Sequence, residues 1–413
     1  MKHYNVIVVG GGAAGIFAAG FAAMHGSQVL LLEKNQHPGA KVLITGKGRC
    51  NLTNSEYDAR QFCEVFGRNG KSLLTALYAF SVEDTIHFFE QHGLPLKTER
   101  GGRVFPARGT AVDVQKVLDA FIKASGVDLK TSCAVKNIEL SGGRVARVLT
   151  SQGEFSADSF IVATGGLSYP ETGCTGDGYH WAEETGHRLI KPEPALVPIQ
   201  LVEPWTAEVS HFNLKNVQIK AMQQGKLLTE RFGEAFFTRG GIGGPIILDM
   251  SANIRDALKY GPVSLVLDLK PAVETELFDK RLQRELASHS NKDFRNSLEN
   301  LLPKDMIPLF IGLSGISPDK KCHSVTKVER EALLALFKKL ELQVSSVGGF
   351  KKAIVTSGGV SLKDIDMRTM RSKKIENLYF AGEVIDLDGP TGGYNLQLCW
   401  STGYLAGISA AGG

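Results

Sequence analysis

The sequence predicts an α/β protein whose main domain holds a parallel sheet and a small β-meander, with a second lobe inserted into it. The first indication is a strand–helix–strand unit at the N-terminus, an order that typically gives parallel pairing. The second is a group of short strands between residues 127 and 162. The third is a proline-rich span at 192–204, after which strand-like sequence of the first kind returns only near residue 345. Proline clusters of this kind often separate domains.

Length and composition are those of an ordinary globular protein with more than one domain. At roughly 150 residues per domain, the 413 residues predict two or three domains. Hydrophobic residues make up 43% and charged residues 22% of the chain, which excludes a wholly disordered protein. Glycine is the outlier, with 46 residues against a typical share of about 7%. Loops in which the backbone approaches a ligand closely would account for this excess.

Charge and cysteine usage exclude several classes of protein. The 47 basic and 43 acidic residues give a net charge of +4 without a run of like charges, so no nucleic-acid partner is expected. Six cysteines lie far apart without a CxxC pair, which predicts no metal site and no disulfide framework and fits the reducing cytoplasm. The chain enters an apolar strand almost at once and has no uninterrupted apolar stretch of 18 residues. Neither a signal peptide nor membrane insertion is therefore expected.

The first elements alternate between strand and helix. Apolar strands at 4–9 and 28–32 flank an alanine-rich helix at 16–26. The glycine-punctuated stretch 39–54 is expected to be a loop with neither helix nor strand. Helical patterning then covers about 71–92 and 111–125, before the turns Ser141-Gly142-Gly143 and Gln152-Gly153 divide the short strands of the meander.

The second half of the chain predicts an insert and then a return to the first domain. The insert is predicted at 191–345, β-rich at 191–270 and 311–345 and helical at 271–310. A strand ending in LYFAGE, a long turn and a helix from about 393 to 410 close the chain. We therefore predict that residues 1–190 and 346–413 form one discontinuous domain.

A glycine pattern between the first strand and the first helix predicts a dinucleotide site. Gly10 would make the tight turn, Gly12 would let a pyrophosphate approach the backbone, and Gly15 would let the helix pack on the strand. The helix N-terminus, with Ala13 and Ala14 in its first turn, would face the phosphates; this chain stretch reads GGGAAG. Glu33 ends the next strand and would accept hydrogen bonds from a ribose 2′-OH.

The C-terminal sequence favours FAD over NAD as the dinucleotide. LYFAGEVIDLDGPTGGYN combines a strand, acidic residues, a glycine pair and a helix start. A simple NAD domain does not need such a loop, whereas FAD places its isoalloxazine ring far from its adenine. Gly392 and Gly393, at a helix N-terminus, could stabilise negative charge on the ring. A glycine turn without a ligand is the alternative.

The whole chain resembles the BaiN/RdsA family of bacterial NAD(P)/FAD-dependent oxidoreductases, which includes aminoacetone oxidase-like members. The resemblance rests on motifs spread from residue 6 to residue 407: VIVVGGGAAG, GAKVLITGKGRCNLTN, GGRVFP, ATGGLSYPETGCTGDGY, VTSGGVSLKDIDMRTM and LYFAGEVIDLDGPTGGYNLQLCWSTGYLAG. It implies a Rossmann-like FAD-binding domain built from both chain ends, with an inserted β-barrel and helical domain.

The resemblance also implies which residues contact non-covalent FAD. Those expected near the ribose, pyrophosphate and adenine are Glu33, Lys34, Lys41 and, through its backbone, Val135. Those expected near the ring and ribityl chain are Gly46, Gly48, Arg49, Cys50 and Asn51. Those expected along the pyrophosphate and ribityl chain are Gly382, Glu383 and Asp386, and those expected at the pyrimidine end of the ring are Gly393, Tyr394, Asn395 and Leu396. Thr164 and Gly165, at the end of the last meander strand, complete the set. Arg49 could instead be a buried ion-pair partner, and Cys50 is expected to be a packed residue rather than a redox thiol, because no resolving cysteine stands beside it.

The sequence departs from the family pattern in two places. Family members commonly carry a histidine after Phe-Thr in the insert, where this chain has Arg239, and Gly243 replaces a serine. Any role of that histidine is therefore in doubt here. Arg371 stands where a glutamate often follows Thr-Met, so an ion pair there is lost or reversed.

Three functions compete. The first is an FAD-dependent oxidoreductase acting on a small-molecule substrate, either reducing an activated C=C bond or oxidising an amine or hydroxyl group with oxygen as acceptor. The second is a dehydrogenase that uses only a pyridine nucleotide, which the C-terminal loop disfavours. The third is a flavin-bearing protein that binds or modifies nucleic acid, which the modest charge disfavours. NAD(P)H could serve as a transient electron donor, and oxygen, a quinone or another protein are alternatives.

Two residues are the candidates for catalysis. Tyr169 could give or take a proton, and Arg239 could orient a carbonyl or carboxylate because its guanidinium stays charged. The glycine-rich stretch 240–244 is expected to be a flexible gating loop. In the alternative interpretation, Tyr169 only packs on the flavin and Arg239 makes a structural ion pair.

Overall fold

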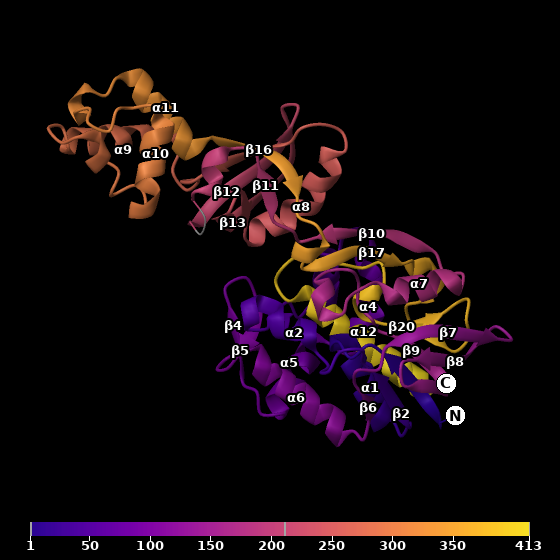
Figure 1. Ribbon diagram of the computed structural model, residues 1–413. Helices are drawn as coiled ribbons and strands as arrows, with labels where there is room; N and C mark the ends of the chain where they lie inside the picture. Colours follow the sequence, from indigo (N-terminus) through magenta and orange to yellow (C-terminus); the bar gives the residue numbers. More distant parts are fainter. Residues whose placement is uncertain (1, 210–211, 413) are drawn as a thin grey trace. The chain divides into compact units, whose positions relative to one another are not determined.

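The computed structural model describes residues 2–209 and 212–412, and its chain divides into two compact units (Figure 1). Unit 1 comprises Met1–Ala195 and Phe350–Gly413, and unit 2 comprises Leu196–Gly349. The domain limits predicted from the sequence, 190 and 346, lie within a few residues of these. Met1 and Gly413, the ends of the predicted FAD domain, fall outside the described residues.

Unit 1 is organised around a mostly parallel sheet. Strand β1 (Lys2–Val9) lies between β2 (Val29–Leu32) and β9 (Gly153–Val162) and is parallel to both. Beyond these, β6 (Asp128–Lys130) pairs with β2, and β20 (Leu378–Phe380) pairs with β9. The side chains in the second half of β1 are buried, as expected for a strand covered on both faces. The C-terminal β20 thus extends a sheet that the N-terminus began.

The predicted meander is confirmed. Strand β8 (Arg144–Thr150) pairs antiparallel with both β7 (Val135–Ser141) and β9. At the other edge the sheet ends in two short strands, β18 (Ile365–Asp366) and β19 (Arg371–Ser372).

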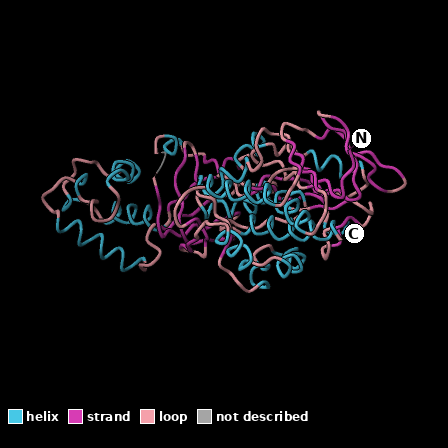
Figure 2. The backbone as a smooth tube through the Cα atoms, turned by 90° about the horizontal axis from the view of Figure 1, so that it is seen from below, coloured by secondary structure: helices cyan, strands magenta, loops and turns pink. Residues whose placement is uncertain are grey.

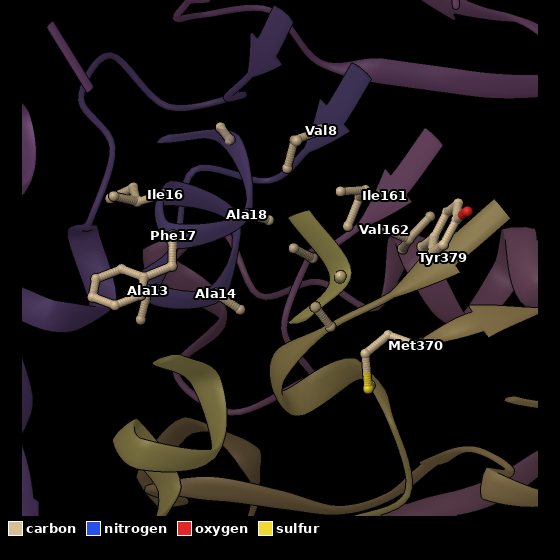
Figure 3. Close-up of a cluster of buried hydrophobic side chains, with 14 of the residues drawn as sticks. Val8, Ala13, Ala14, Ile16, Phe17, Ala18, Ile161, Val162, Met370 and Tyr379 are labelled. Atoms are coloured by element: carbon tan, nitrogen blue, oxygen red, sulfur yellow. The ribbon is translucent and has the colours of Figure 1, made fainter. Parts of the chain in front are cut away.

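Two helices from opposite ends of the chain pack on each other. Helix α1 (Ala13–Met24) lies beside α12 (Tyr394–Ala411) (Figure 1). A Cβ on Gly403 would lie 2.4 Å from the Ala14 carbonyl oxygen, so the two backbones are in direct contact there. Side chains of α1, among them Phe17, lie in one buried cluster with Val8 of β1 and Ile161 of β9 (Figure 3).

The remaining helices of unit 1 follow β2 and precede β10 in the sequence. They are α2 (Ala40–Ile44), α3 (Ala59–Glu64), α4 (Leu74–Ala79), α5 (Val82–Gln91), α6 (Ala111–Ala124) and α7 (Asp177–Glu184). The helical stretch predicted at 71–92 is divided because Phe80 is extended and the Ser81 side chain caps α5. The prediction of neither helix nor strand at 39–54 is wrong, since α2 and β3 (Thr53–Asn54) lie there. β3 pairs with β5 (Arg103–Pro106), which pairs with β4 (Leu96–Glu99).

Unit 1 is joined to the insert through an antiparallel strand pair. Strand β10 (Leu189–Ala195) pairs with β17 (Val355–Val360), so the chain leaves and re-enters unit 1 at one place.

Unit 2 contains the closed barrel that the resemblance implied. Its strands follow the order β11 (Ile199–Leu201), β14 (Gly241–Gly243), β13 (Lys226–Thr238), β12 (Asn213–Gln223), β15 (Ser264–Asp268) and β16 (Leu340–Val347). Helix α8 (Pro245–Leu258) packs on β13. The flexible gating loop expected at 240–244 is wrong, because Gly241–Gly243 is a barrel strand. A Cβ on Gly241 would lie 2.2 Å from the Ile199 carbonyl oxygen.

Three helices of unit 2 lie together apart from the barrel strands (Figure 2). They are α9 (Thr275–Ser288), α10 (Ile307–Ser314) and α11 (Lys327–Lys338). The prediction that 311–345 is β-rich is therefore wrong for residues 311–338, and β16 is the one strand of the structure in this range. The reason is a capping box between Thr326 and Glu329 that begins α11, whose Leu333 and Phe337 are both buried.

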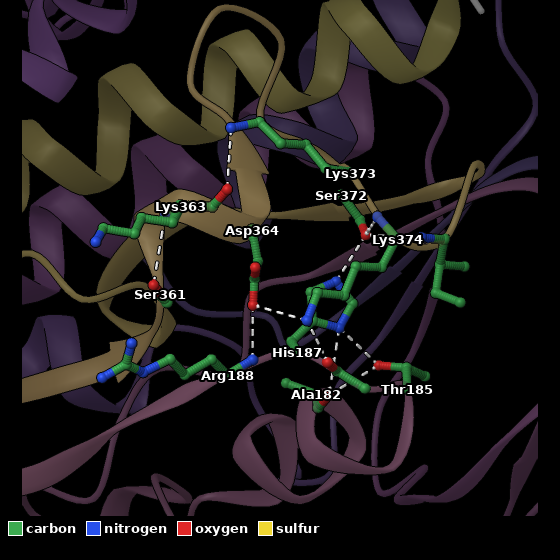
Figure 4. A network of polar contacts seen from close by, with 12 residues as sticks. Ala182, Thr185, His187, Arg188, Ser361, Lys363, Asp364, Ser372, Lys373 and Lys374 are labelled. Carbon is green, nitrogen blue, oxygen red and sulfur yellow. Dashed lines mark hydrogen bonds and ion pairs between the residues drawn. The ribbon is translucent and has the colours of Figure 1, made fainter.

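A buried histidine ties the end of α7 to the segment that contains β18 and β19 (Figure 4). The His187 ring hydrogen bonds with the Ser372 hydroxyl at 2.6 Å and the Thr185 hydroxyl at 2.9 Å. Beside it, the Asp364 carboxylate accepts from the Arg188 N–H at 2.7 Å and pairs with the Lys374 ammonium at 3.1 Å. Burial lowers the pKa of His187 below its ordinary value, so the ring is neutral at neutral pH.

This histidine should make the stability of unit 1 fall in mild acid. Below the ordinary histidine pKa the unfolded chain takes up a proton that the folded chain resists, so the free energy of unfolding decreases until the folded pKa is reached. The decrease for one proton is at most about 1.4 kcal/mol per pH unit. Thermal unfolding at several pH values between 7.5 and 5.0 should show a smaller slope for His187→Gln than for the wild type. His180→Gln, at an exposed position of α7, is the control; identical slopes for wild type and His187→Gln would contradict this account.

Candidate flavin-binding site

Of the three motif glycines in the turn after β1, two stand at crowded positions and one stands at an open position. A Cβ on Gly10, whose φ is +105°, would lie 2.5 Å from the Ala163 carbonyl oxygen, and one on Gly15 would lie 1.8 Å from the Gly10 carbonyl oxygen. At Gly12 no atom lies within 4 Å of the added Cβ. Gly12 is also the N-cap of α1, and no side chain caps that helix. The first turn of α1 therefore presents backbone N–H groups beside open space, which suits a phosphate.

Glu33 is held by the backbone on both of its carboxylate oxygens. Oε2 accepts from the Gly11 N–H at 2.8 Å and Oε1 from the Asn35 N–H at 2.7 Å. The side chain is buried. A carboxylate has about four acceptor sites, so further hydrogen bonds can form. The predicted bond to a ribose stays a prediction, while the structure adds that Glu33 fixes the glycine turn to the end of β2.

The two predicted lysines have different surroundings. The Lys34 ammonium contacts the Thr175 hydroxyl at 2.5 Å and Asp177 at 2.7 Å, at the start of α7. The Lys41 ammonium contacts the Ser168 hydroxyl at 2.5 Å and the Glu383 carboxylate at 2.6 Å. Lys41 is thus directed at the C-terminal part of the site.

Glu383 is the centre of a polar group that we call the Lys41 cluster, made of Lys41, Ser168, Thr356 and Glu383. Besides the lysine, the carboxylate accepts from the Ser168 hydroxyl at 2.8 Å and the Thr356 N–H at 2.7 Å. Burial lowers the pKa of Lys41, but the Glu383 charge more than offsets this, so the pKa is raised and the ammonium stays charged. Sequence reasoning missed Ser168 and Thr356, because hydroxyl and backbone groups carry no recognisable spacing.

The loop after α2 follows a left-handed path. Gly46, Lys47, Gly48 and Cys50 have φ values of +56°, +58°, +80° and +58°. Cys50 is fully buried, and burial raises the pKa of its thiol to about 12. It is therefore a packed residue, as predicted, and not a nucleophile.

Arg49 makes an ion pair, but at the surface rather than in the interior. Its guanidinium donates to both Glu99 oxygens, at 2.6 and 3.2 Å, and lies 4.2 Å from the centre of the Phe105 ring. Its side chain is 46% exposed. The alternative interpretation is therefore right that Arg49 forms an ion pair and wrong that the pair is buried.

The C-terminal loop meets both N-terminal loops within unit 1. A Cβ on Gly393, the N-cap of α12, would lie 2.3 Å from the Thr53 carbonyl oxygen, and one on Gly382 would lie 2.7 Å from the Ala14 Cβ. The Asn54 amide also donates to the Gly392 carbonyl at 3.1 Å. The structure therefore brings the predicted ring-end residues of the C-terminus to the glycine turn and to β3.

Side chains within this C-terminal loop brace it. Asn395 accepts from the Gly389 N–H at 2.8 Å and donates to the Gly389 and Pro390 carbonyls. Asp386 accepts from the Asn69 amide at 3.3 Å, and burial raises the pKa of its carboxyl group. Tyr394 and Leu396, also predicted here, pack against the hydrophobic core.

Two buried polar atoms of the candidate set have no hydrogen-bond partner among the described residues. They are Oδ1 of Asn51 and Oγ1 of Thr164. Buried polar atoms are normally satisfied, so an orphaned one points to a ligand or water. Together with the open space at Gly12, they show that these residues fit a polar dinucleotide such as FAD.

Four other predicted residues have surroundings that say less about a ligand. Val135 begins β7 and pairs with Thr150. Tyr169 is partly buried in a left-handed conformation with φ +51°, and its N–H donates to the Phe350 carbonyl. Gly165 lies beside the Cys174 sulfur. Arg239 belongs to unit 2, where it is exposed after β13. The predicted catalytic roles of Tyr169 and Arg239 stay predictions.

Comparison with known proteins identifies the family. The model of the HI0933-like protein Rossmann domain matches residues 4–409, which is nearly the whole chain. The chain belongs to this family. Membership confirms the resemblance found in the sequence and makes the chain an FAD-dependent oxidoreductase with a Rossmann-like fold.

Curated relatives align along the full chain. A 3-dehydro-bile acid delta(4,6)-reductase from Clostridium scindens is 32% identical over 408 residues, with 98% of each chain covered. Ribosomal RNA dihydrouridine synthases from Haemophilus influenzae and Escherichia coli are 30% and 29% identical, covering 99% and 98% of this chain and 99% and 97% of theirs. Both of the competing substrate classes therefore occur among the relatives, and the expectation of no nucleic-acid partner stays a prediction.

Solved structures share the fold at low sequence identity. The 3-ketosteroid delta1-dehydrogenase of Sterolibacterium denitrificans superposes with a TM-score of 0.57 at 14% identity, with all of both chains covered. The 3-ketosteroid-delta4-(5alpha)-dehydrogenase of Rhodococcus jostii RHA1 gives 0.55 at 16% identity, with 99% of this chain and 97% of that one covered. Within residues 2–209 and 212–412 no helix is long and apolar enough to cross a membrane, and no cluster of three metal-binding side chains occurs.

The open space at Gly12 gives a test that separates ligand binding from folding. Gly12→Val should fold normally, because an added Cβ has no atom of the described structure within 4 Å, but the side chain should occupy the space that we assign to the pyrophosphate. We expect unchanged apoprotein melting and a loss of bound FAD, measured by absorbance near 450 nm. Gly312→Val in α10, where a Cβ also meets no atom, is the matched control. A fully yellow Gly12→Val protein would refute the assignment of this turn.

The Lys41 cluster should contribute more to the free energy of unfolding than an ordinary surface ion pair does. Lys41→Met leaves the Glu383 carboxylate with little exposure and no charged partner, so the free energy of unfolding should fall by about 3 kcal/mol. Lys34→Met, which removes a more exposed ion pair, should cost only about 0.5 kcal/mol. Urea unfolding of the apoprotein measures both. Adding Glu383→Gln to Lys41→Met should recover part of the loss, and a purely additive double variant would show that the two residues are not coupled.

Proposed function

We propose that this protein is a reductase that uses FAD to saturate a carbon–carbon double bond conjugated to a carbonyl group. The observation that carries the proposal is the meeting of three loops in unit 1. Gly382 lies against the first turn of α1, and Gly393 lies against β3. A ligand long enough to contact the glycine turn at one end and the C-terminal loop at the other suits this arrangement, and FAD has that length.

The choice of a double bond is supported by the relatives. The Clostridium reductase and the Haemophilus and Escherichia synthases both reduce carbon–carbon double bonds, the first in a bile acid and the others in uridine. The substrates differ, whereas the bond chemistry is common to both. The proposal therefore rests on the type of bond that is reduced.

In this proposal the residues of the chain hold FAD and donate a proton to the substrate. Bound FAD supplies hydride transfer. The first turn of α1 stabilises the negative phosphates, and the N-terminus of α12, with Gly392 and Gly393 before it, favours negative charge near the ring. Asn51 and Thr164 offer hydrogen-bonding atoms, and the Lys41 cluster holds the surrounding loops in place. In this proposal Tyr169 of unit 1 donates the proton.

NAD(P)H is the electron donor in this proposal, bound transiently. It gives up one hydride and leaves as NAD(P)+, while the double bond gains one hydride and one proton. The alternative from the sequence, an amine oxidase, would instead take electrons from the substrate and pass them to oxygen. The two alternatives differ in which partner reduces the flavin.

An anaerobic stopped-flow experiment should separate these possibilities. We expect NADH or NADPH to bleach the 450 nm flavin absorbance and an α,β-unsaturated ketone such as cyclohexenone to restore it faster than buffer does. Cyclohexanone, which lacks the double bond, is the matched control and should restore nothing. Flavin bleaching by a primary amine, with hydrogen peroxide formed when air is admitted, would instead support the oxidase.

A second candidate function is reduction of a uracil base in RNA. It is favoured by one specific observation: on the β4–β5 hairpin, Lys97 and Arg103 lie on one face beside Arg49, and Glu99 is the carboxylate among them.

A further inference from the structure

The two strands of the β4–β5 hairpin place four side chains on one face. Lys97 is opposite Phe105 and Glu99 is opposite Arg103 in the antiparallel register. Directly opposed residues, and residues two apart on one strand, point to the same side of a sheet. Arg49 joins them, since it pairs with Glu99 and covers the Phe105 ring. We call these five residues the Arg49 face.

Arg49 has a fixed plane on this face. Its guanidinium donates to both oxygens of Glu99 and lies over the Phe105 ring. The carboxylate holds the edge of the guanidinium group, and the aromatic ring covers one of its faces. Nearly half of the side chain remains exposed. A guanidinium plane held in this way is a platform on which an unpaired nucleobase can stack.

The Arg49 face is also positively charged. Arg49, Lys97 and Arg103 stand against the one carboxylate of Glu99, which pairs with Arg49 and, at 3.1 Å, with Lys97. These hydrogen bonds, that from Arg49 first, lower the pKa of Glu99 to about 2, so the carboxylate stays ionised and the arginine stays anchored. Lys97 is 45% exposed and can also reach a ligand. The surplus of positive charge suits phosphate groups.

The face borders the candidate flavin site. Arg49 itself belongs to the left-handed loop that precedes Asn51. Asn54 donates to the Gly101 carbonyl in the hairpin turn at 3.0 Å and to the Gly392 carbonyl in the C-terminal loop. One side chain thus connects the hairpin with the ring end of the site.

We propose that the Arg49 face binds single-stranded RNA, with an unpaired base stacked on Arg49 and neighbouring phosphates at Lys97 and Arg103. A base plane flanked by cations requires a ligand that offers bases and phosphates in succession. Lys97 and Arg103 are diagonal neighbours on the two strands, with backbones roughly 7–8 Å apart, and two separated cations favour an extended polyanion over a single phosphate. The inference rests on the proposed function only for the position of the flavin, and it assigns the substrate to a polynucleotide.

Fluorescence anisotropy with a labelled single-stranded 12-nucleotide uridine-rich RNA tests the proposal. Lys97→Gln/Arg103→Gln should raise the Kd at least fivefold in 50 mM salt. It should also reduce the slope of log Kd against log salt by about 1.4, since each lost contact with a single strand contributes about 0.7. Lys116→Gln/Lys123→Gln, which removes two exposed charges from α6, is the matched control and should bind as the wild type does.

Further arms examine the stacked base and the source of the phosphates. An abasic strand of equal length should bind more weakly than the RNA, and a duplex should do the same, because neither offers an unpaired base. Arg49→Lys keeps the charge but loses the plane, so it should weaken binding of the RNA and leave binding of the abasic strand unchanged. The proposal is overturned if the wild type does not bind RNA, if the control variant loses as much affinity, if the duplex binds equally, or if millimolar NADPH displaces the RNA.

The binding result does not depend on turnover. RNA binding without reduction of any double bond would support this inference and contradict the proposed function. Reduction of cyclohexenone by a protein that ignores RNA would do the reverse.

Discussion

The candidate site depends on the close contact between the first and the last helix of the chain. Gly403 and Gly407 of α12 allow its backbone to touch that of α1, where a Cβ at either position would lie 2.4 Å from a carbonyl oxygen, of Ala14 or Ala18. Two helices can approach this closely only where side chains are absent. Because α12 begins at Gly393, this contact also sets where the C-terminal loop lies relative to the glycine turn. The N-terminal and C-terminal parts of unit 1 therefore meet at the place where the ligand is expected.

The glycines around this site divide into those that the fold needs and those that it does not. Gly10, Gly15 and Gly393 each stand where a side chain would collide with backbone, so packing alone explains them. Gly12 stands in open space, and nothing in the described structure requires it to be small. Gly12 is also the N-cap of α1, which has no side-chain cap, so this open position suits a phosphate, whereas the crowded glycines of the same motif are explained by packing.

Local patterns of the sequence predicted the sheet, the meander, the helix at each end of unit 1 and the family, because each leaves a signal within a few dozen residues. Residues that pair across a long separation in the sequence leave no such signal. Lys41 and Glu383 are 342 residues apart, and Arg49 and Glu99 are 50 apart, so neither pair could be matched by spacing. Helix α11 was missed for another reason: its capping box at Thr326 lies inside a stretch interpreted as continuing the strands. The two orphaned atoms, on Asn51 and Thr164, are visible only once every partner is placed.

The net charge of the chain conceals a local excess of positive charge. A net charge of +4 over 413 residues argued against nucleic acid as a partner. That argument assumes that charge is spread evenly, whereas binding depends on the charge within about one Debye length of the ligand, which is about 8 Å at physiological salt. On the Arg49 face three cations surround one carboxylate, and that carboxylate serves to hold the arginine plane in position. The excess of two positive charges on this face is therefore a better guide to whether a polyanion can bind there than the net charge of the whole chain.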